Sequence, residues 1–348
     1  MPSEKDLLNA LSHVIDPELG RNIVELTMVR DLKFLDGVVT FTLALTVPSC
    51  PLRDRLAADA RAALTAVKGV DQVNINFSAM TDDERRQVLG DRQPQLPKLN
   101  QFNTVGRVVA VMSGKGGVGK SAVTAMLAVA LSRKGLKVGI LDADITGPSI
   151  PKLFGLPAGG VRAAEQGFLP ALTGLGIKVM SINLLVKEVD SPVIWRGPMI
   201  TSAIRQFWEE TLWGKLDILL VDMPPGTSDA AITVVQSLPL CGVVMVTTPQ
   251  ELAVMVVRKA VHMLRSLKIP VLGVVENMSF FTCPDSGKPH YIFGPSHAQE
   301  IAELAASPAA LQLPLDPQVA ALCDAGQSEL LDIRPLQSMT LQVMGSDQ

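Results

Sequence analysis

The sequence predicts an α/β protein with a doubly wound, mainly parallel sheet, preceded by a small α+β domain. Three observations support this prediction. Residues 107–121 read as a strand, a glycine-rich loop and the start of a helix. After them, apolar β-branched runs alternate with helical segments, which is typical of a parallel sheet covered on both faces. Before them, a polar segment with two prolines separates this pattern from a shorter one.

We expect two domains joined by a linker. The chain has 348 residues, which suffices for two domains of ordinary size. Residues 91–102 (DRQPQLPKLNQF) hold two prolines and no apolar periodicity, so they are predicted to form the linker. The small α+β domain then covers residues 1–90, and the larger domain covers residues 103–348.

In the small domain, apolar spacing predicts two helices and two strands. The helices are expected over residues 3–13, with Ser3 as N-cap, and over residues 51–67, and the strands over 38–45 and 70–76. The second helix carries apolar residues at helical spacing, namely Leu52, Leu56, Ala60, Ala63 and Leu64.

In the larger domain, strands and helices alternate. Strands are predicted over residues 107–112, 137–141, 217–221, 242–247 and 271–276, and helices over 121–131, 200–210 and 251–266. Ligands of such sheets bind outside the carboxyl ends of the strands. The residues that directly follow the strands are therefore the candidate functional residues.

Residues 113–121 (SGKGGVGKS) match the phosphate-loop pattern Gly-x-x-x-x-Gly-Lys-[Ser/Thr]. Backbone N–H groups of such a loop and the dipole of the following helix attract phosphate, and glycine lets the backbone approach it closely. The predicted nucleotide-binding residues are Gly114, Lys115, Gly116, Gly117, Val118, Gly119, Lys120 and Ser121, whereas Ala122 is assigned no role.

Within this loop, Lys120 is expected to reach the β- and γ-phosphate oxygens, and the Ser121 hydroxyl is expected to ligate Mg²⁺. The alternative is a glycine-rich turn that binds nothing, and the strand and helix on either side argue against it. The motif therefore predicts a P-loop NTPase with a Mg²⁺ site.

A second lysine, Lys115, follows the first glycine of the loop. In this feature the sequence resembles the deviant Walker A ATPases, a superfamily that includes MinD- and ParA-like proteins. Within it, the chain looks most like the Mrp/ApbC iron–sulfur cluster carrier proteins. The resemblance implies that Lys115 reaches the nucleotide of a partner subunit in a homodimer. A solvated loop charge is the alternative.

Two further segments resemble the switch regions of that family. Asp142-Ala143-Asp144 is followed by ITGPS, and the resemblance implies that Asp144 orients the attacking water and Asp142 supports the magnesium shell. Two helix-capping acids are the alternative. Asp222 ends an apolar strand and precedes MPPGTSD, which implies a Mg²⁺ contact for Asp222 and a γ-phosphate contact for Gly226. Catalytic roles accordingly fall to Lys115, Lys120 and Asp144.

Asn277, in the segment ENMS, matches the residue that the family uses at the adenine ring. A turn asparagine at a strand end is an equally good reading. The segment WRGPM, which contains Arg196, also resembles a family segment, but we assign Arg196 no role.

The cysteine pattern departs from the family. Many Mrp/ApbC proteins carry a Cys-Pro-x-Cys pair after ENMS, so that two subunits supply four thiolates to one bridging [4Fe–4S] cluster. Here Cys283 is present, but Ser286 stands in the second position. Serine is a poor ligand for iron, so a dimer would supply two thiolates instead of four, and an iron–sulfur cofactor is in doubt.

The other cysteines are widely spaced, which argues against a disulfide framework and for a reducing cytoplasm. Cys50 precedes a predicted helix in a segment that resembles a metal–sulfur-cluster-biosynthesis domain, and it is either a cluster ligand or a structural cysteine. Cys241 precedes a predicted buried strand and is expected in the core. Cys323 could be either a core cysteine or a cluster ligand.

Composition excludes several functions. The net charge of −3 gives no basic footprint for nucleic acid. No apolar run is long enough for a membrane span, and the N-terminal residues lack the apolar core of a secretory signal. We therefore expect neither nucleic-acid nor membrane partners.

The resemblance implies a slow ATPase that assembles, carries or transfers iron–sulfur clusters, with apoproteins or assembly scaffolds as partners. Two alternatives remain open. One is an ATP-dependent scaffold without its own cluster, which Ser286 favours. The other is a nucleotide-switched partitioning or positioning protein like MinD or ParA, although the C-terminal residues (RPLQSMTLQVMGSDQ) lack a basic amphipathic pattern.

Overall fold

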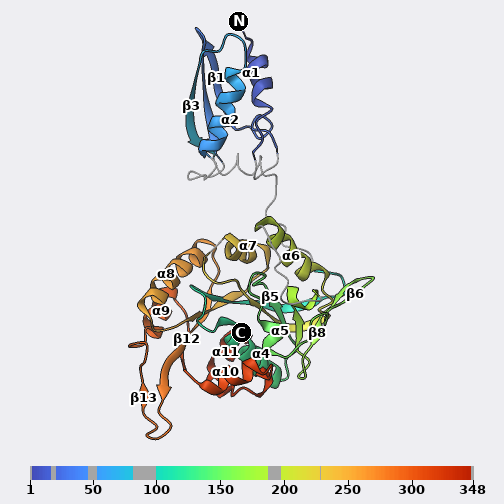
Figure 1. Ribbon diagram of the computed structural model, residues 1–348, viewed down its shortest axis with the longest axis vertical. Coiled ribbons are helices and arrows are strands. Elements are labelled where there is room, and N and C mark those ends of the chain that lie inside the picture. The colour runs from blue at the N-terminus through green and yellow to red at the C-terminus, as the bar shows by residue number, and fades with distance from the viewer. Residues whose placement is uncertain are drawn as a thin grey trace. The chain divides into compact units, whose positions relative to one another are not determined.

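The chain folds into two compact units, Met1–Gln95 and Leu96–Gln348, each with its own hydrophobic core. A computed structural model describes residues 2–16, 21–45, 53–80, 99–186, 197–227 and 229–345. Figure 1 colours the elements of both units by residue number.

The smaller unit is a three-stranded sheet with two helices on one face (Figure 1). The strands lie in the order β1 (Val29–Leu35), β2 (Val38–Leu45), β3 (Gln72–Ala79). The first pair is antiparallel and the second is parallel, with α2 (Arg53–Thr65) connecting the parallel strands. α1 (Glu4–Leu11) packs beside α2.

Local sequence explains most of these elements. Ser3 caps α1, because its hydroxyl accepts from the Asp6 backbone N–H while the Asp6 carboxylate accepts from the Ser3 N–H. Leu56, Ala60 and Leu64 of α2 are fully buried. Strand β1 was not predicted, since three of its seven residues are charged and an irregularity at residues 30–33 interrupts its pairing.

The larger unit contains a nine-stranded sheet within the described residues, in the order β13-β12-β11-β4-β10-β5-β9-β8, with β14 paired to β12. All pairs are parallel except those made by the edge strands β13 and β8. The strands are β4 (Thr104–Ser113), β5 (Val138–Asp142), β8 (Ala171–Leu172), β9 (Lys178–Met180), β10 (Lys215–Asp222), β11 (Gly242–Thr247), β12 (Val271–Thr282), β13 (Pro289–His290) and β14 (Ala310–Pro314).

Helices cover both faces of this sheet, with α4, α10 and α11 on one side and α6, α7 and α8 on the other (Figure 1). Their bounds are α4 (Lys120–Arg133), α5 (Ile150–Leu153), α6 (Gly197–Glu210), α7 (Asp229–Ser237), α8 (Glu251–Ser266), α9 (Ala298–Ala305), α10 (Pro317–Asp324) and α11 (Gln337–Met344). A separate ribbon pairs β6 (Arg162–Ala164) with β7 (Gly167–Leu169). The prediction of a doubly wound, mainly parallel sheet is confirmed.

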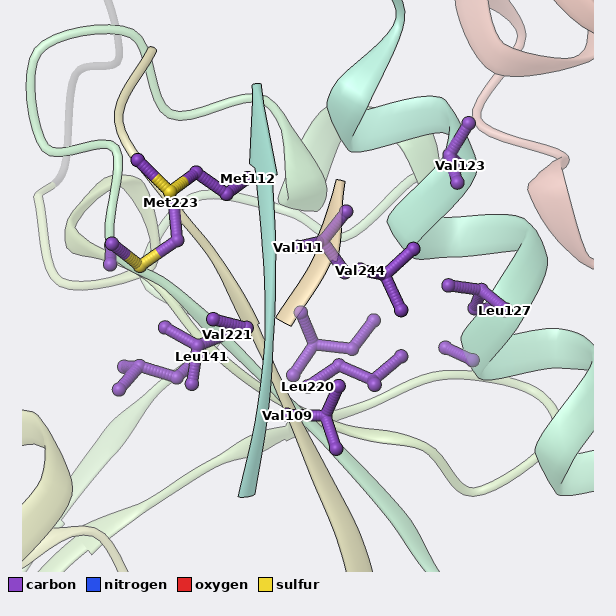
Figure 2. Close-up of a cluster of buried hydrophobic side chains, with 14 of the residues drawn as sticks. Val109, Val111, Met112, Val123, Leu127, Leu141, Leu220, Val221, Met223 and Val244 are labelled. Atoms are coloured by element: carbon purple, nitrogen blue, oxygen red, sulfur yellow. The ribbon is translucent and has the colours of Figure 1, made fainter. Parts of the chain in front are cut away.

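The central strands are buried on both faces, which is why they read as continuous apolar runs. In Figure 2, Val109 and Val111 of β4 lie on the side of α4, near Val123 and Leu127, whereas Met112 lies on the opposite side. Burying each such side chain stabilises the fold by about 1.5–3 kcal/mol. This packing fixes the start of α4 against the sheet, and hence the loop between them.

No helix among the described residues is long and apolar enough to cross a membrane.

Candidate functional site

The predicted site residues from three strands meet at one edge of the sheet. In the parallel register, Asp222 at the end of β10 lies beside Asp142 at the end of β5 on one side and beside Val111 of β4 on the other. The glycine-rich loop leaves β4 at the same edge and leads into α4. The structure therefore brings together the loop, Asp142 and Asp222.

Two glycines of the loop have left-handed backbone conformations, with φ of 81° at Gly117 and at Gly119. Gly119 is also the N-cap of α4. A Cβ atom at Gly119 would lie 2.3 Å from Asn277 Nδ2, and a Cβ at Gly114 would lie 2.9 Å from the Val257 backbone nitrogen. Glycine is therefore required both by the loop conformation and by its close approach to β12 and α8.

Lys120 and Ser121 both contact the carboxylate of Asp222. Lys120 Nζ lies 2.7 Å from Asp222 Oδ2, and the Ser121 hydroxyl donates to the same oxygen at 2.7 Å. The Lys120 side chain is 7% exposed and that of Asp222 is fully buried. Lys120 thus neutralises a buried carboxylate, and a phosphate entering the loop would compete for this cation.

Thr124, which sequence analysis did not identify, also contacts Asp222. Its hydroxyl lies 2.7 Å from Asp222 Oδ1, and the residue is completely buried. Thr124 stands four positions after Lys120, so the two share a face of α4. The helical spacing between Lys120 and Thr124 could have placed Thr124 on the same face of α4. It could not have indicated that this face of the helix meets Asp222.

Asp142 is completely buried and holds the segment that follows β5. Its carboxylate accepts hydrogen bonds from the Ser181 hydroxyl at 3.1 Å and from the backbone N–H groups of Ile150 and Asp144, both at 3.3 Å. Burial, and then the charge of Asp222, raise the pKa of the Asp142 carboxyl well above its usual range. The bond from Ile150, the first residue of α5, is of the helix-capping kind that the sequence offered as the alternative role. The role of Asp142 in a magnesium shell stays a prediction.

Asp144 lies two residues further along this segment and is 9% exposed. Its Oδ1 accepts from the Thr146 hydroxyl at 3.0 Å and from the Gly147 N–H at 3.1 Å. Within the described residues, Oδ2 accepts no hydrogen bond that the structure records. In that part of the chain, the carboxylate is therefore held through Oδ1.

The two loops after β4 and β10 are tied together. The Gly226 N–H donates to the Ser113 carbonyl at 2.9 Å, and the Ser113 hydroxyl donates to the Lys115 carbonyl at 3.0 Å. Gly226 has φ of 83°. The segment containing Gly226 thus lies against the phosphate loop, where contact with a γ-phosphate was predicted. Ser228 and Arg196 lie outside the described residues.

Lys115 points to the start of α8, where its Nζ donates to the side-chain oxygen of Gln250 at 2.5 Å. Gln250 is the N-cap of α8, with no side-chain cap of its own. The sequence contained no sign of this contact, because the two residues are 135 positions apart. The predicted reach of Lys115 into a partner subunit requires that it leave Gln250.

Asn277 contacts the phosphate loop directly, since its amide donates to the Val118 carbonyl at 2.9 Å. It also lines a cavity of about 520 Å³, together with Gly119, Ala122, Leu313 and Asp316. The cavity adjoins the loop, and its volume is in the range of small-molecule sites. This placement suits base recognition, which remains a prediction for Asn277.

Strand β12 is longer than predicted. It continues to Thr282, past an irregularity at residues 276–280 where Met278 has φ of 56°, because β14 pairs with it again at Phe280 and β13 pairs with its last two residues. Figure 1 shows this end of β12 projecting with β13 from the body of the unit. Asn277 therefore lies within a strand, and Cys283 lies at its tip.

The turn after β12 surrounds Cys283 with hydrogen-bond donors. The backbone is closed by bonds between Cys283 and Lys288 at 3.0 Å and between Gly287 and Cys283 at 2.9 Å. The Ser286 hydroxyl, and then the backbone N–H groups of Ser286 and Asp285, lower the pKa of the Cys283 thiol below its usual value. Ser286 thus acts on the thiol as a hydrogen-bond donor, although it occupies the position at which the family pattern has a second cysteine.

Glu276 anchors the base of this hairpin. It is completely buried and accepts from the Ser279 hydroxyl at 2.6 Å and from the His297 backbone N–H at 2.7 Å. These two donors lie on either side of the projecting segment. Since Glu276 precedes Asn277, the hairpin base and the phosphate-loop contact are adjacent in the chain.

The remaining cysteines differ in exposure. Cys241 is exposed, so the prediction of a core cysteine is wrong; it precedes β11, and only the strand itself is buried. Cys323 is buried beside Ser328, and burial raises the pKa of its thiol. Cys50 lies outside the described residues. Among those that are described, no group of three or more His, Cys, Asp and Glu side chains is arranged to hold a metal ion.

Each of the two units of the chain matches a known protein family. Residues 104–344 match the family of the NUBPL iron-transfer P-loop NTPase, and residues 4–77 match a family described as iron-sulfur cluster assembly protein. The iron-sulfur cluster carrier protein of Synechocystis is 44% identical over 292 residues, covering 83% of this chain and 80% of that protein. The protein of the same name from Deinococcus radiodurans is 41% identical, covering 93% of this chain and 88% of its own.

Among solved structures, a nucleotide-binding protein from Archaeoglobus fulgidus in complex with ADP is similar to the larger unit. It has a TM-score of 0.61 and 46% sequence identity, covering 67% of this chain and 91% of that protein.

Proposed function

This chain belongs to the NUBPL iron-transfer P-loop NTPase family, and it is similar over most of its length to iron-sulfur cluster carrier proteins. We propose that it binds Mg·ATP and hydrolyses it slowly while it assembles, carries or transfers iron–sulfur clusters to apoproteins. The observation that carries the ATPase part is the convergence of Lys120 and Ser121 on Asp222 at the carboxyl edge of the sheet.

The residues at this edge fit Mg²⁺. A serine hydroxyl and a buried carboxylate oxygen lie 2.7 Å apart beside the loop, and both are hard oxygen ligands of the kind that Mg²⁺ prefers. Ser121 and Asp222 would hold the ion, Asp222 through water, and the ion would neutralise phosphate charge. Lys120 would turn from Asp222 to the β- and γ-phosphate oxygens, with the loop N–H groups around them.

Hydrolysis then depends on positioning, because phosphoryl transfer requires little covalent chemistry from the protein. Asp144 is held through Oδ1, which supports a role for Oδ2 in orienting the attacking water. Gly226, placed against the loop through Ser113, would contact the γ-phosphate with its backbone N–H once that bond is exchanged. Asn277 would hold the base in the adjoining cavity.

We further propose that the working unit is a homodimer in which Lys115 contacts the partner's nucleotide. Among the described residues, Lys115 donates to the side chain of Gln250, a neutral acceptor. A bond from the lysine ammonium to a neutral amide is weaker than one to a charged phosphate, so a phosphate can displace Gln250 at modest cost. The three cysteines within the described residues are free thiols, which supports a reducing cytoplasm as the compartment.

A second candidate is an ATP-dependent scaffold that binds no cluster of its own. It rests on Ser286, which leaves Cys283 as the one thiol of the projecting hairpin. The family assignment favours an iron–sulfur function over the partitioning or positioning alternative.

The test of the ATPase proposal is steady-state ATP hydrolysis by the full chain and three variants. Lys120→Ala and Ser121→Ala are expected to lower turnover at least tenfold, because each removes a contact that stabilises the transferred phosphoryl group. Lys134→Ala, at the exposed end of the same helix, should behave like wild type.

Lys120→Ala leaves a buried carboxylate without its cation, which typically costs about 3–5 kcal/mol, so each variant is first melted in the absence of nucleotide. Ser121→Ala keeps the Lys120–Asp222 pair and serves where Lys120→Ala is unstable. Folded variants that hydrolyse ATP as fast as wild type would show that the site lies elsewhere.

A further inference from the structure

The two oxygens of the Asp222 carboxylate have different partners. Lys120 and Ser121 both contact Oδ2, whereas Thr124 contacts Oδ1. All three come from the first two turns of α4, and Asp222 is completely buried at the end of β10. Among the hydrogen bonds recorded for the described residues, Thr124 is the one donor to Oδ1.

The Thr124 hydroxyl has two acceptors within reach but only one proton. Asp222 Oδ1 lies at 2.7 Å, and the Lys120 carbonyl lies at 3.0 Å. A hydrogen bond to an ionised carboxylate is shorter and stronger than one to a neutral carbonyl. The shorter distance therefore assigns the proton to Asp222.

The partners of Oδ2 are the side chains that nucleotide binding would redirect. Under the proposed function, on which this inference rests, Lys120 turns to the phosphates and Ser121 to Mg²⁺. Thr124 has no such second task, because it is buried one turn further from the loop. The carboxylate torsion of an aspartate is broad and weakly restrained by itself. The Thr124 bond would then restrain the plane of the Asp222 carboxylate.

We infer that Thr124 is a positioning residue: its bond to Oδ1 keeps Oδ2 of Asp222 facing the phosphate loop when Lys120 and Ser121 engage Mg·nucleotide. It touches neither nucleotide nor metal itself. Removing its hydroxyl should weaken the response of nucleotide binding to Mg²⁺ while leaving the binding of metal-free nucleotide intact.

The experiment is calorimetric titration of the full chain with ADP, in excess Mg²⁺ and in EDTA. The ratio of the two affinities measures how much Mg²⁺ strengthens binding. Thr124→Val has nearly the same shape without the hydroxyl, and it should lower this ratio about tenfold, as expected for the loss of one hydrogen bond to a charged group. Its ADP affinity in EDTA should stay within about twofold of wild type, and Thr124→Ser, which keeps the donor, should restore most of the ratio.

Thr340→Val is the matched control. Thr340 is also a completely buried helical threonine, but its hydroxyl donates to the Gln337 carbonyl. This variant should keep the wild-type ratio even if it is less stable. Should Thr124→Val fail to fold, Thr124→Cys replaces it, since a thiol is a weak donor.

Several outcomes decide the inference. If folded Thr124→Val, or Thr124→Cys in its place, responds to Mg²⁺ like wild type, Thr124 does not position Asp222, and the proposed ATPase stands unaffected. An equal loss of affinity in EDTA and in Mg²⁺ would also overturn the inference, because it indicates a merely structural role. A wild type whose ADP affinity does not respond to Mg²⁺ would overturn the proposed metal site and this inference together.

Discussion

Cys283 illustrates how one neighbouring residue sets the chemistry of a side chain. Its thiol is partly exposed at the tip of β12, where burial raises its pKa less than the surrounding hydrogen bonds lower it. The hydroxyl of Ser286 is the main reason why its pKa is lowered. A thiolate is the reactive and metal-binding form, so Cys283 should be reactive at a lower pH than an ordinary cysteine.

At this scale we predict that Ser286→Ala raises the pKa of the Cys283 thiol toward its ordinary value. The hydroxyl stabilises the charged form, so its loss means that the thiolate appears only at higher pH. The measurement is the rate of alkylation of the metal-free protein against pH, followed by mass spectrometry of the Cys283 peptide. Exposed Cys241 is the internal control, and its profile should not move. An unchanged or lowered midpoint for Cys283 would contradict the assignment.

The projecting end of β12 and β13 carries Cys283, the cluster ligand predicted in the larger unit. Its base is fixed by Glu276, which bonds to Ser279 and to the His297 N–H on either side of the projection. Its tip is closed by backbone bonds around Cys283. A tip held in this way can accept a second thiol without losing its conformation, since Ser and Cys differ by one atom.

At the element scale we predict that Ser286→Cys increases the amount and lifetime of a reconstituted cluster. Two tips would then supply four thiolates, the number that a [4Fe–4S] cluster takes, whereas the wild-type tips supply two. Iron and sulfide per dimer and the visible charge-transfer absorption are measured after anaerobic reconstitution. Ser266→Cys, at an exposed position of α8, controls for a thiol added elsewhere.

The wild type and Cys283→Ala complete this experiment. If wild type already holds about four irons per dimer and Cys283→Ala keeps them, the tip is not the cluster site, and Cys50 and Cys323 become the candidates. If wild type holds them and Cys283→Ala loses them, additional ligands join Cys283 and the cluster-free scaffold is excluded.

At the scale of the whole molecule, the proposed homodimer would draw the catalytic residues of each site from two subunits. Lys120, Ser121 and Asp222 are assembled within one chain, whereas Lys115 points away from them to Gln250. A complete site by this proposal takes Lys115 from the partner. Each dimer then has two composite sites.

We predict that mixing Lys115→Ala subunits with Asp144→Ala subunits restores part of the ATPase activity. In a mixed dimer, one site combines the intact Asp144 of one chain with the intact Lys115 of the other. The second site lacks both, so recovery cannot exceed about half of the wild-type rate per dimer. Differently tagged subunits allow mixed dimers to be isolated before the assay. Isolated mixed dimers without any recovery would argue that Lys115 acts within its own chain.

The sequence alone determined the features that depend on local pattern. The phosphate loop, the apolar strands around it and helix α8 were predicted because each is encoded within a short segment, and β11 and α8 were predicted to the residue. Ser3 was identified as a cap for the same reason. Strand β1 was not predicted, because charged residues and an irregularity obscure its alternation of apolar and polar residues.

Only the tertiary structure decided which distant groups meet. Thr124 contacts Asp222 across 98 positions, and Lys115 contacts Gln250 across 135. The length of β12 depends on β13 and β14, which pair with it from later in the chain. The exposure of Cys241 likewise depends on where a strand begins within the packed sheet. Such contacts are set by the packing of the whole domain, and no local spacing in the sequence encodes them.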